Sequence, residues 1–403
     1  MFVSYAYKLV RGASDSRLLR LLNGQRIVDA MFDAAPQGIS RADIARVTGL
    51  SKPTVSNLVA DLESSGLIRL AETPTTSGNV GRPAMLYEFV PEAGFVVAAD
   101  IGATKIIVGV ANLLGAVVAE QELETGPNAE TALNRVAETA HQMLAEVGGQ
   151  AGSACIGVPG IYRPATDSVE QALNLPGFEG LRVRARLVGL LDMDVHVDND
   201  VNLAALAEAD LDIDQTNFAA ISIGTGIGMG IIVGGELYRG GTGAAGEVGS
   251  LVLHASPTDS NAPLILEDIS SAPAIRKQFG QAAESGFPTE LHGSADVPEI
   301  FDAAAQGDPA AVHVLESAAE AMATAVMQVC LLIDPERIVF GGGVGANPVF
   351  VEAVNAELRR QLPQPVEVFA STLGRRATFL GAVSRALDEL HESLVTDTLG
   401  RPR

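Results

Sequence analysis

The sequence predicts an α/β protein in which a small helical domain precedes two larger lobes of strands and helices. At 403 residues, the chain is longer than one compact domain usually is. Apolar residues recur at helical spacing before residue 70, whereas short apolar runs joined by Gly-Thr turns recur after residue 95. We expect domains at residues 1–90, 91–200 and 201–403, with the C-terminal helix of the last lobe packing back on the first.

Charge divides the chain at the same boundary. The net charge of −22 would disfavour a nucleic-acid partner if it were spread evenly, because phosphate backbones attract basic surfaces. Residues 1–90 carry 10 Lys and Arg against 8 Asp and Glu, whereas residues 91–403 carry 17 against 41. The first segment is therefore compatible with DNA, although a short segment can also be near neutral by chance.

The composition indicates a globular protein of the cytoplasm. Only Cys155 and Cys330 occur, which excludes a disulfide framework and a zinc site made of cysteines. The start, MFVSYAYKLVRG, lacks the pattern of a signal peptide, and no apolar run reaches the roughly 18 residues that span a bilayer. We expect no membrane partner.

Residues 23–64 have the spacing of a helix followed by a helix-turn-helix. The first helix is expected over 23–35, before Pro36 and Gly38. Ser40 and Asp43 have the form of a capping box, which starts a short second helix that ends near Gly49. Ser51 can cap a third helix, with Pro53 in its first turn. Its expected buried stripe is Val55, Leu58, Val59 and Leu62.

The third helix has the character of a recognition helix that enters the major groove of double-stranded DNA. Asn57 is the candidate for a base contact, because its amide can bond adenine N6 and N7 together. Small hydroxyl residues and a lysine beside the helix N-terminus are suited to phosphates. The expected DNA-binding residues on this helix are Ser51, Lys52, Thr54, Ser56 and Asn57.

Two predicted strands, 67–70 and 84–89, flank a polar loop that would form a wing. Arg82, in the tripeptide Gly81-Arg82-Pro83, could enter a narrow minor groove, where the negative potential is enhanced. The tripeptide alone better suits a solvated hairpin turn. A helix-turn-helix also occurs in protein-interaction modules, but the added wing favours DNA.

Three glycine turns follow short apolar runs and suit the binding of a nucleotide. Glycine lets backbone N–H groups approach phosphate oxygens, and an Asp can hold magnesium through water. The first two turns repeat one strand, Gly-Thr, strand pattern, so the chain looks internally duplicated. Together the three resemble the phosphate-1, phosphate-2 and adenosine segments of the actin-like ATPase and sugar kinase fold. The candidate residues are Asp100, Gly102, Thr104 and Lys105, then Gly224, Thr225 and Gly226, then Gly341 and Gly342.

The run Asp198-Asn199-Asp200 stands between a predicted strand and an Ala-rich helix. Asp200 is the candidate general base, since a carboxylate near a sugar hydroxyl could take its proton during attack on a γ-phosphate. Its alternative role is to cap the helix that begins nearby. Glu247, at the end of a glycine-rich loop, could accept hydrogen bonds from a pyranose.

The wing and the motifs D-x-G-x-T-K, N-D-V-N, G-T-G-x-G, A-G-E-x-G and F-G-G-G, in this order, resemble the ROK family. The resemblance runs from about Asn23 to Leu394 and is greatest to the repressor branch, which includes xylose and N-acetylglucosamine repressors. It implies a sugar cleft between two lobes. The candidate ligand residues are Asn174, Asn199, Asp200, Glu247 and Glu267.

The chain departs from this family at its zinc site. Ser250 stands where the family has a zinc-binding His, and the three Cys ligands are missing from residues 251–266, which offer only His254. A structural zinc needs about four N or S ligands, so no structural zinc is expected.

Three functions remain open at this point. The favoured one is a transcriptional regulator, most simply a repressor of carbohydrate metabolism genes, that binds an operator as a homodimer or homotetramer and senses a sugar. That function requires no cofactor. The second is a bifunctional sugar kinase that uses ATP and magnesium, and the third is a kinase whose N-terminal segment is only an interaction module.

Overall fold

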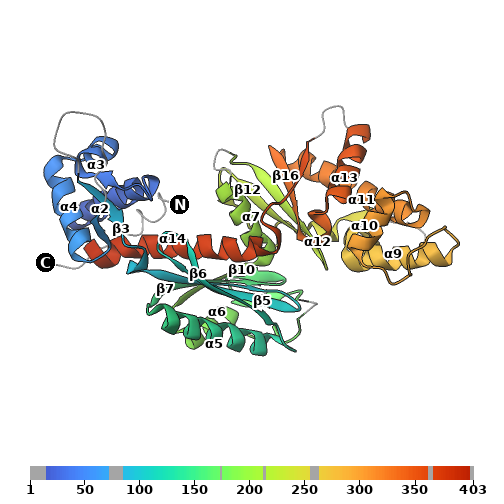
Figure 1. The fold of residues 1–403 in the computed structure, drawn as a ribbon, viewed down its shortest axis with the longest axis horizontal. Coiled ribbons are helices and arrows are strands. Elements are labelled where there is room, and N and C mark those ends of the chain that lie inside the picture. The colour runs from blue at the N-terminus through green and yellow to red at the C-terminus, as the bar shows by residue number, and fades with distance from the viewer. Residues whose placement is uncertain are drawn as a thin grey trace.

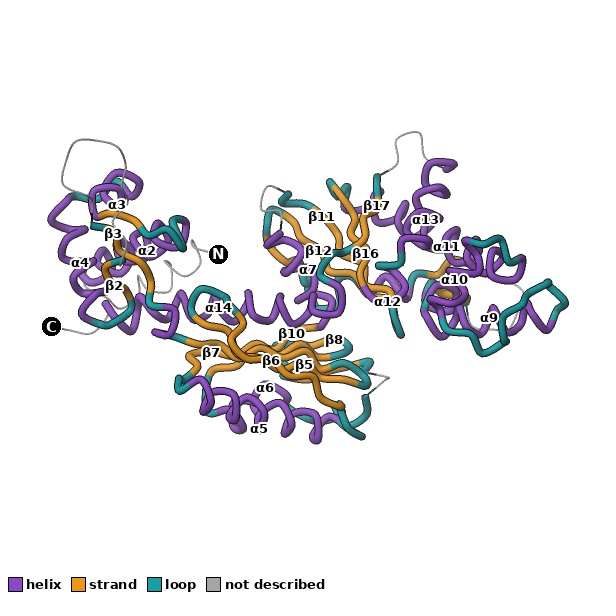
Figure 2. Tube along the Cα trace, viewed as in Figure 1, coloured by secondary structure: helices purple, strands orange, loops and turns teal. Residues whose placement is uncertain are grey.

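A computed structural model describes residues 15–71, 85–172, 175–211, 215–254, 263–361 and 366–399 of the chain. Figure 1 shows an N-terminal unit and two lobes, with one long helix running from the lobes into the N-terminal unit. Figure 2 shows the same arrangement by secondary structure, with a strand layer in each lobe. The expected α/β class, with a winged helical unit ahead of two lobes, is confirmed.

The N-terminal unit consists of α2 (Asp15–Asp33), α3 (Arg41–Thr48) and α4 (Lys52–Ser64), with a small sheet. The sheet has the order β1 (Ile39–Ser40), β3 (Leu86–Phe89), β2 (Ile68–Leu70) and is antiparallel. Ser40 caps α3 as expected, since its side chain accepts a hydrogen bond from the Asp43 backbone N–H. Helix α2 begins ahead of the predicted residue 23, because Leu21 extends its buried side.

The first lobe is a five-stranded sheet with the order β10 (Asp194–Asn199), β7 (Ala151–Val158), β4 (Phe95–Ile101), β5 (Lys105–Asn112), β6 (Val117–Glu124). Residues Phe95, Val97 and Ala99 of β4 face α5 (Ala129–Val147) and α6 (Val183–Leu191). Val96 and Ala98 face the opposite way and join the core of α14 (Ala377–Leu399). A hairpin of β8 (Ile161–Arg163) and β9 (Ser168–Glu170) extends from this lobe.

The second lobe repeats the plan of the first. Its sheet has the order β17 (Val368–Ala370), β16 (Arg337–Gly341), β11 (Phe218–Ile223), β12 (Ile227–Val233), β13 (Glu236–Leu237). The pairing senses match those of β10, β7, β4, β5 and β6, with parallel pairs on one side of the central strand and antiparallel pairs on the other. The internal duplication expected from the glycine turns is therefore present in the fold.

Further elements complete the second lobe. Between the lobes lies α7 (Asp200–Leu211), and three short segments are η1 (Pro91–Ala93), η2 (Val248–Ser250) and η3 (Gly374–Arg376). The others are the hairpin β14 (Val252–His254) with β15 (Leu264–Ile265), and the helices α8 (Glu267–Ser270), α9 (Ala272–Glu284), α10 (Val297–Ala305), α11 (Pro309–Ile333), α12 (Gly342–Gly345) and α13 (Pro348–Gln361).

Helix α11 is long and apolar enough to cross a bilayer by length and composition, a feature that the search for apolar runs in the sequence missed. Most of its apolar side chains, including Val314, Met322 and Val326, lie in the core of the second lobe. The core role explains its composition. Leu331 and Leu332, at its C-terminal end, are instead 86% and 84% exposed.

Helix α14 ties the three units together. It packs on β4 and β7 of the first lobe, on α7, and on α2 and α4 of the N-terminal unit (Figure 1). At Gly381 the backbones of α14 and α7 touch, because a Cβ there would lie 1.7 Å from the Leu203 carbonyl oxygen. At the other end, the Phe32 ring stacks between Phe89 and His391, with ring centroids 4.1 and 3.9 Å away.

Candidate functional site

Helix α4 presents the predicted DNA-binding face. Its buried side consists of Val55, Leu58, Val59 and Leu62, as expected. The Ser51 side chain accepts a hydrogen bond from the Thr54 backbone N–H at 3.3 Å, and the two hydroxyls lie 2.8 Å apart. Lys52 and Asn57 are exposed, Ser56 is half-buried, and Arg82 lies outside the described residues. Ser51 and Thr54 therefore cap the helix, while Lys52 and Asn57 are free to reach outward.

The second site is a cleft of about 400 Å³ between the lobes. It brings together most of the residues predicted from separate motifs, although Asn174 lies outside the described residues. Small-molecule clefts combine a few polar side chains with backbone groups that fix the orientation of a ligand. The predicted residues that line the cleft are Gly102, Asn199, Asp200, Gly224, Thr225, Gly226, Glu247 and Glu267.

Asn199 and Asp200 have different roles at the start of α7: Asn199 caps the helix, and Asp200 presents a carboxylate to the cleft. The Asn199 Oδ1 atom accepts from the backbone N–H groups of Val201 (2.9 Å) and Asn202 (3.1 Å), and its Nδ2 donates to the Gly160 carbonyl (2.9 Å). Asn199 thus performs the capping that sequence reasoning had offered as the alternative role for Asp200. The Oδ1 atom of Asp200 accepts from the Val201 N–H at 2.9 Å, and the Asn199 side chain and the backbone N–H of Asp200 itself also donate to this carboxylate, which lines the cleft.

Burial raises the pKa of Asp200 to about 6, and the Glu247 carboxylate adds to the rise. Burial, together with the charge of Asp200, raises the pKa of Asp100 to about 7. Asp100 does not line the cleft directly, since Gly102 and Ala103 stand in front of it. The pair can hold one proton between them near neutral pH, as suits a group that accepts a hydroxyl proton.

Backbone geometry fixes the two glutamates on the opposite wall. Gly246 has a φ of +94°, and a Cβ there would lie 1.8 Å from the Met229 carbonyl oxygen, so only glycine lets the loop approach β12 and present Glu247. Glu267, the first residue of α8, accepts from the Ile227 backbone N–H at 3.0 Å through Oε2. Burial and the nearby Glu267 raise the pKa of Glu247.

The predicted nucleotide residues separate into two places. Gly341 and Gly342 line a recess of about 150 Å³ that shares Val201 and Ser222 with the cleft. Glu208 and Ser371 also line this recess, and the Ser371 hydroxyl donates to the Glu208 carboxylate. Lys105 stands outside both cavities, because its ammonium group is paired with Glu122 on β6. The predicted phosphate contact of Lys105 is therefore not made in this arrangement.

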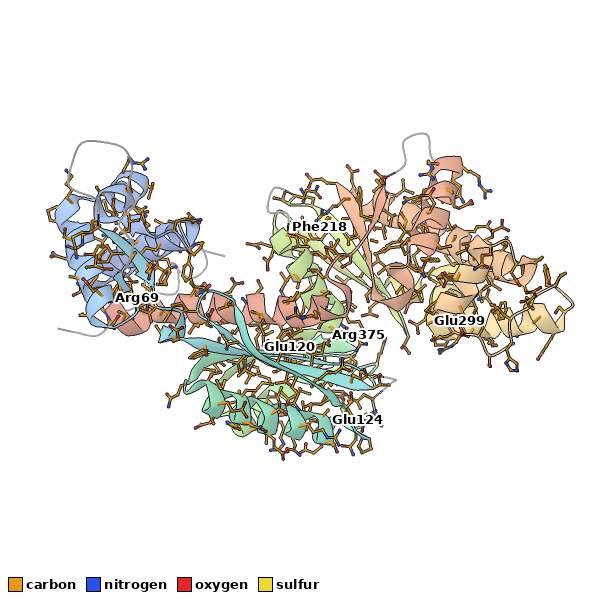
Figure 3. All side chains as sticks on the ribbon, viewed as in Figure 1. Arg69, Glu120, Glu124, Phe218, Glu299 and Arg375 are labelled. Atoms are coloured by element: carbon orange, nitrogen blue, oxygen red, sulfur yellow. The ribbon has the colours of Figure 1, made fainter. Side chains whose placement is uncertain are left out.

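Thr104 is exposed and likewise lines neither cavity. Arg375 of η3 pairs with Glu122 of β6, and Arg376 of η3 pairs with Glu120 of β6. Figure 3 labels Arg375 and Glu120, one residue of each pair. These ion pairs hold the lobes together beside the recess.

Sequence reasoning missed two residues of the cleft region. Gln171 lines the cleft with a φ of +58°, an unusual backbone conformation for a residue other than glycine. Arg239 of the second lobe binds Asp198 of the first through Nε (2.9 Å) and Nη2 (2.5 Å). Neither has a local signal, because the first depends on a backbone angle and the second on contact between the lobes.

The described residues do not fit the zinc site that the family resemblance implies. They contain no group of three or more His, Cys, Asp or Glu placed to hold a metal ion. Ser250 closes η2 through its backbone N–H, which donates to the Glu247 carbonyl at 3.2 Å. Backbone hydrogen bonds therefore hold the loop that carries Glu247.

Comparisons with known proteins match both parts of the chain, the N-terminal unit and the two lobes. The model of the ROK family matches residues 96–389, and that of the MarR family matches residues 30–77. A putative xylose repressor of Caldicellulosiruptor sp. is 26% identical over 93% of this chain and 97% of its own length. A glucokinase of Thermotoga maritima is 28% identical over 72% of this chain and 96% of its own length.

The crystal structure of a ROK family transcriptional regulator, a homologue of the E. coli MLC protein, has the same fold over the whole length. Its TM-score is 0.78 at 23% identity, and the match covers 94% of this chain and 99% of that one. The glucokinase lacks a counterpart for most of the N-terminal unit, whereas the repressor and the regulator extend across it. The chain therefore belongs to the ROK family, in the transcriptional-regulator branch that carries a winged helix ahead of the ROK domain.

Proposed function

We propose that this protein is a repressor of carbohydrate metabolism genes and that a sugar bound between its lobes sets its affinity for the operator. The main support for this proposal is that one helix connects the cleft with the DNA-binding unit. One helix, α14, packs against both the cleft helix α7 and the DNA-binding unit. The similarity to a putative xylose repressor supports the same function.

The chemistry of the cleft suits a neutral sugar. Asp200, Glu247 and Glu267 supply carboxylate oxygens, which accept hydrogen bonds from hydroxyl groups, and the glycines around them leave room for a ring. A site that pairs each hydroxyl discriminates strongly against analogues that lack one, because its buried acceptors are then left unpaired. The names of the relatives, a xylose repressor and a glucokinase, support a monosaccharide effector.

The route from cleft to DNA begins at Asp200 itself. The hydroxyl of Thr378, in the first turn of α14, donates to the Asp200 carbonyl oxygen at 3.1 Å. The far end of α14 is held by Arg20 of α2, whose Nε donates to the Leu399 carbonyl at 3.2 Å and whose Nη2 pairs with Asp61 of α4 at 2.5 Å. A shift of α7 on ligand binding would therefore move α14 and, with it, the recognition helix.

The operator is double-stranded DNA, and the protein acts on it as a homodimer or homotetramer in the cytoplasm. Two recognition helices on a symmetric assembly would address half-sites about 34 Å apart. The exposed Leu331 and Leu332 support self-association, since an exposed apolar pair at a helix end is a common element of subunit contacts. Repression requires no cofactor.

Operator binding and its release by sugar test the proposal. Genomic fragments selected by the purified protein would be titrated in a mobility-shift assay with xylose, glucose and N-acetylglucosamine. We expect one sugar to change the operator affinity of the wild type, and we expect Asp200→Asn to bind DNA but not to respond. Asp302→Asn, an exposed change on α10, is the matched control. An operator affinity that no sugar changes would contradict the regulatory role.

A second candidate function is phosphorylation of the same sugar by ATP and magnesium. Asp200, with its raised pKa beside a sugar-sized cleft, favours it, as does the glycine recess at Gly341. Magnesium would neutralise the transferring phosphate, and Asp100, which lies behind the cleft lining in this structure, is the carboxylate that the sequence motif offers to hold it through water. ADP release across the sugar panel, lost in Asp200→Asn, would establish this activity. No turnover with any sugar would leave the protein a sensor.

A further inference from the structure

A second cavity, of about 320 Å³, lies at the seam where the two lobes meet. It adjoins the sugar cleft, because Asn202 and Gly243 line both. The first lobe contributes the β8–β9 hairpin, α6 and β10, and the second lobe contributes the loop after β13. Its polar and charged lining residues are Tyr162, Arg184, His196, Asp198, Asn202 and Arg239.

The wall between this cavity and the sugar cleft is a contact between the lobes. A Cβ at Gly243 would lie 2.9 Å from the Tyr162 carbonyl oxygen, so the second-lobe loop rests directly on the hairpin of the first lobe. The Arg163 guanidinium donates to the Thr242 carbonyl at the same place. A ligand in the second cavity therefore touches both lobes just behind their point of contact.

Two arginines line the cavity, and each is already paired with one carboxylate. Among the described residues, Asp198 is the one carboxylate in the lining; it is 4% exposed, and its oxygens are already used. Its Oδ1 accepts from the Asn199 N–H (2.8 Å) and from Asn202 Nδ2 (3.0 Å), and its Oδ2 accepts from Arg239. Arg184 pairs with Asp194, which lies outside the lining, so the cavity itself offers donors and little free acceptor capacity.

One nitrogen of each guanidinium group is available to donate to a ligand. Arg184 donates through Nε to the Val195 carbonyl (2.7 Å) and through Nη2 to Asp194 (2.6 Å), and Arg239 donates through Nε and Nη2 to Asp198. Within the described residues, the Nη1 atom of each has no hydrogen-bond acceptor. Guanidinium nitrogens bind carboxylate and phosphate oxygens most strongly.

Basic side chains are scarce in the lobes. Residues 91–403 hold 41 acidic side chains against 17 basic ones, yet two arginines line one small cavity. An uncharged sugar would find few acceptors here, because Asp198 is saturated. The volume is at the lower end of the range for small-ligand sites, about 300–1,000 Å³.

We propose that this cavity binds an anionic group, a carboxylate or a phosphate, which Arg184 of the first lobe and Arg239 of the second hold together. Such an anion ties the lobes at the seam and adds to the ligand control of lobe closure. The group is either a free small anion or the charged end of a sugar that also occupies the cleft. The second source deepens the proposed function by making the effector an acidic or phosphorylated sugar, whereas the first is independent of it.

Isothermal titration of the purified full-length protein tests the proposal with four probes: inorganic phosphate, succinate, glucose and glucose 6-phosphate. Arg184→Gln removes one guanidinium from the half-exposed edge of the cavity, and Arg184→Lys keeps the charge but loses the planar fork. Arg186→Gln, on the same helix and paired with Glu130 outside the cavity, is the matched control. Melting curves without ligand check that each variant is folded.

We expect phosphate or succinate to bind the wild type, or glucose 6-phosphate to bind more tightly than glucose. In either case we expect Arg184→Gln to weaken binding of the anion about tenfold or more, Arg184→Lys to weaken it less, and Arg186→Gln to leave it unchanged. Binding of the free anions in Asp200→Asn would show that the site is separate from the sugar site. If no probe binds in a way that depends on Arg184 while the variants melt normally, the proposal is wrong.

Discussion

Adding one methyl group at Gly381 is expected to force α14 away from α7. The new Cβ would lie 1.7 Å from the carbonyl oxygen of Leu203 and 2.5 Å from its carbonyl carbon, which are backbone atoms that cannot rotate aside. Relief to an ordinary contact of 3.4 Å requires the helices to separate by about 1.7 Å, and overpacking of this kind costs about 1–3 kcal/mol. At about 2–4 °C per kcal/mol for a unit of this size, the lobe transition should melt lower by roughly 2–12 °C.

Gly189→Ala is the matched control for Gly381→Ala. Gly189 also lies inside a helix, α6, but nothing stands within 4 Å of its Cβ position. Alanine there should be neutral or stabilise the protein by up to about 1 kcal/mol, through helix propensity alone. Both variants would be compared by differential scanning calorimetry and by the effect of the sugar on operator binding. Equal melting temperatures for the two variants would refute the close contact of α7 and α14.

Three further predictions concern the two sites. Asn57→Ala should weaken operator binding by about 1–3 kcal/mol, because a base contact is lost. Lys52→Ala should reduce the slope of log affinity against log salt concentration by about 1, because one phosphate contact is lost. Mobility shifts over a salt series separate the two effects, and equal effects in both variants would contradict these roles. Thr378→Val removes the hydrogen bond to Asp200 and should reduce the operator response to sugar without changing sugar affinity, as calorimetry and mobility shifts can compare. Because the pKa of Asp200 is about 6, sugar affinity should fall about tenfold from pH 7 to pH 5. The change should be smaller in Asp200→Asn, where Glu247, whose pKa is also raised, still titrates.

The raised pKa of Asp200 also determines how the stability of the folded protein changes with pH. Burial raises the pKa of Asp200 from its ordinary value of 3.8, so the folded protein holds a proton that the unfolded chain releases. The resulting stability is complete below pH 4 and is lost as the pH rises through about 6. Asp200→Asn should therefore raise the melting temperature at pH 8 relative to the wild type and give no such gain at pH 4. A larger gain at pH 4 would contradict the burial of this carboxyl group.

The elements that sequence reasoning predicted well depend on local rules. Ser40 and Ser51 are followed at the right spacing by backbone N–H groups that need an acceptor, so each starts a helix whatever surrounds it. The cleft residues Asp200 and Glu247 were found because short motifs fix glycines, strand ends and acids along the chain. Strand order then carries these motif ends to one edge, which is why residues predicted separately meet in one cleft.

What sequence reasoning missed depends on contacts between distant segments. Lys105 follows a phosphate-type turn, but its direction is set by Glu122 on the next strand, which pairs with it. In the sequence, Arg239 is one residue before a glycine-rich loop and has no distinguishing pattern. Its role appears only in the folded protein, where it binds Asp198 of the other lobe. No spacing rule ranks such pairs, because which charged side chains meet depends on the segments that the folded sheets and lobes bring side by side.

The core explains why ligand control can reach the DNA. Residues Leu58 of the recognition helix, Val96 and Ala98 of β4, Leu203 of α7 and Leu390 of α14 belong to one continuous apolar cluster, so the winged unit has no core of its own that is separate from the lobe. Close-packed side chains move between a few discrete arrangements and not by small continuous deformation. A sugar that repositions α7 must therefore change the packing under α4, while a sugar that binds without moving α7 would leave the operator bound.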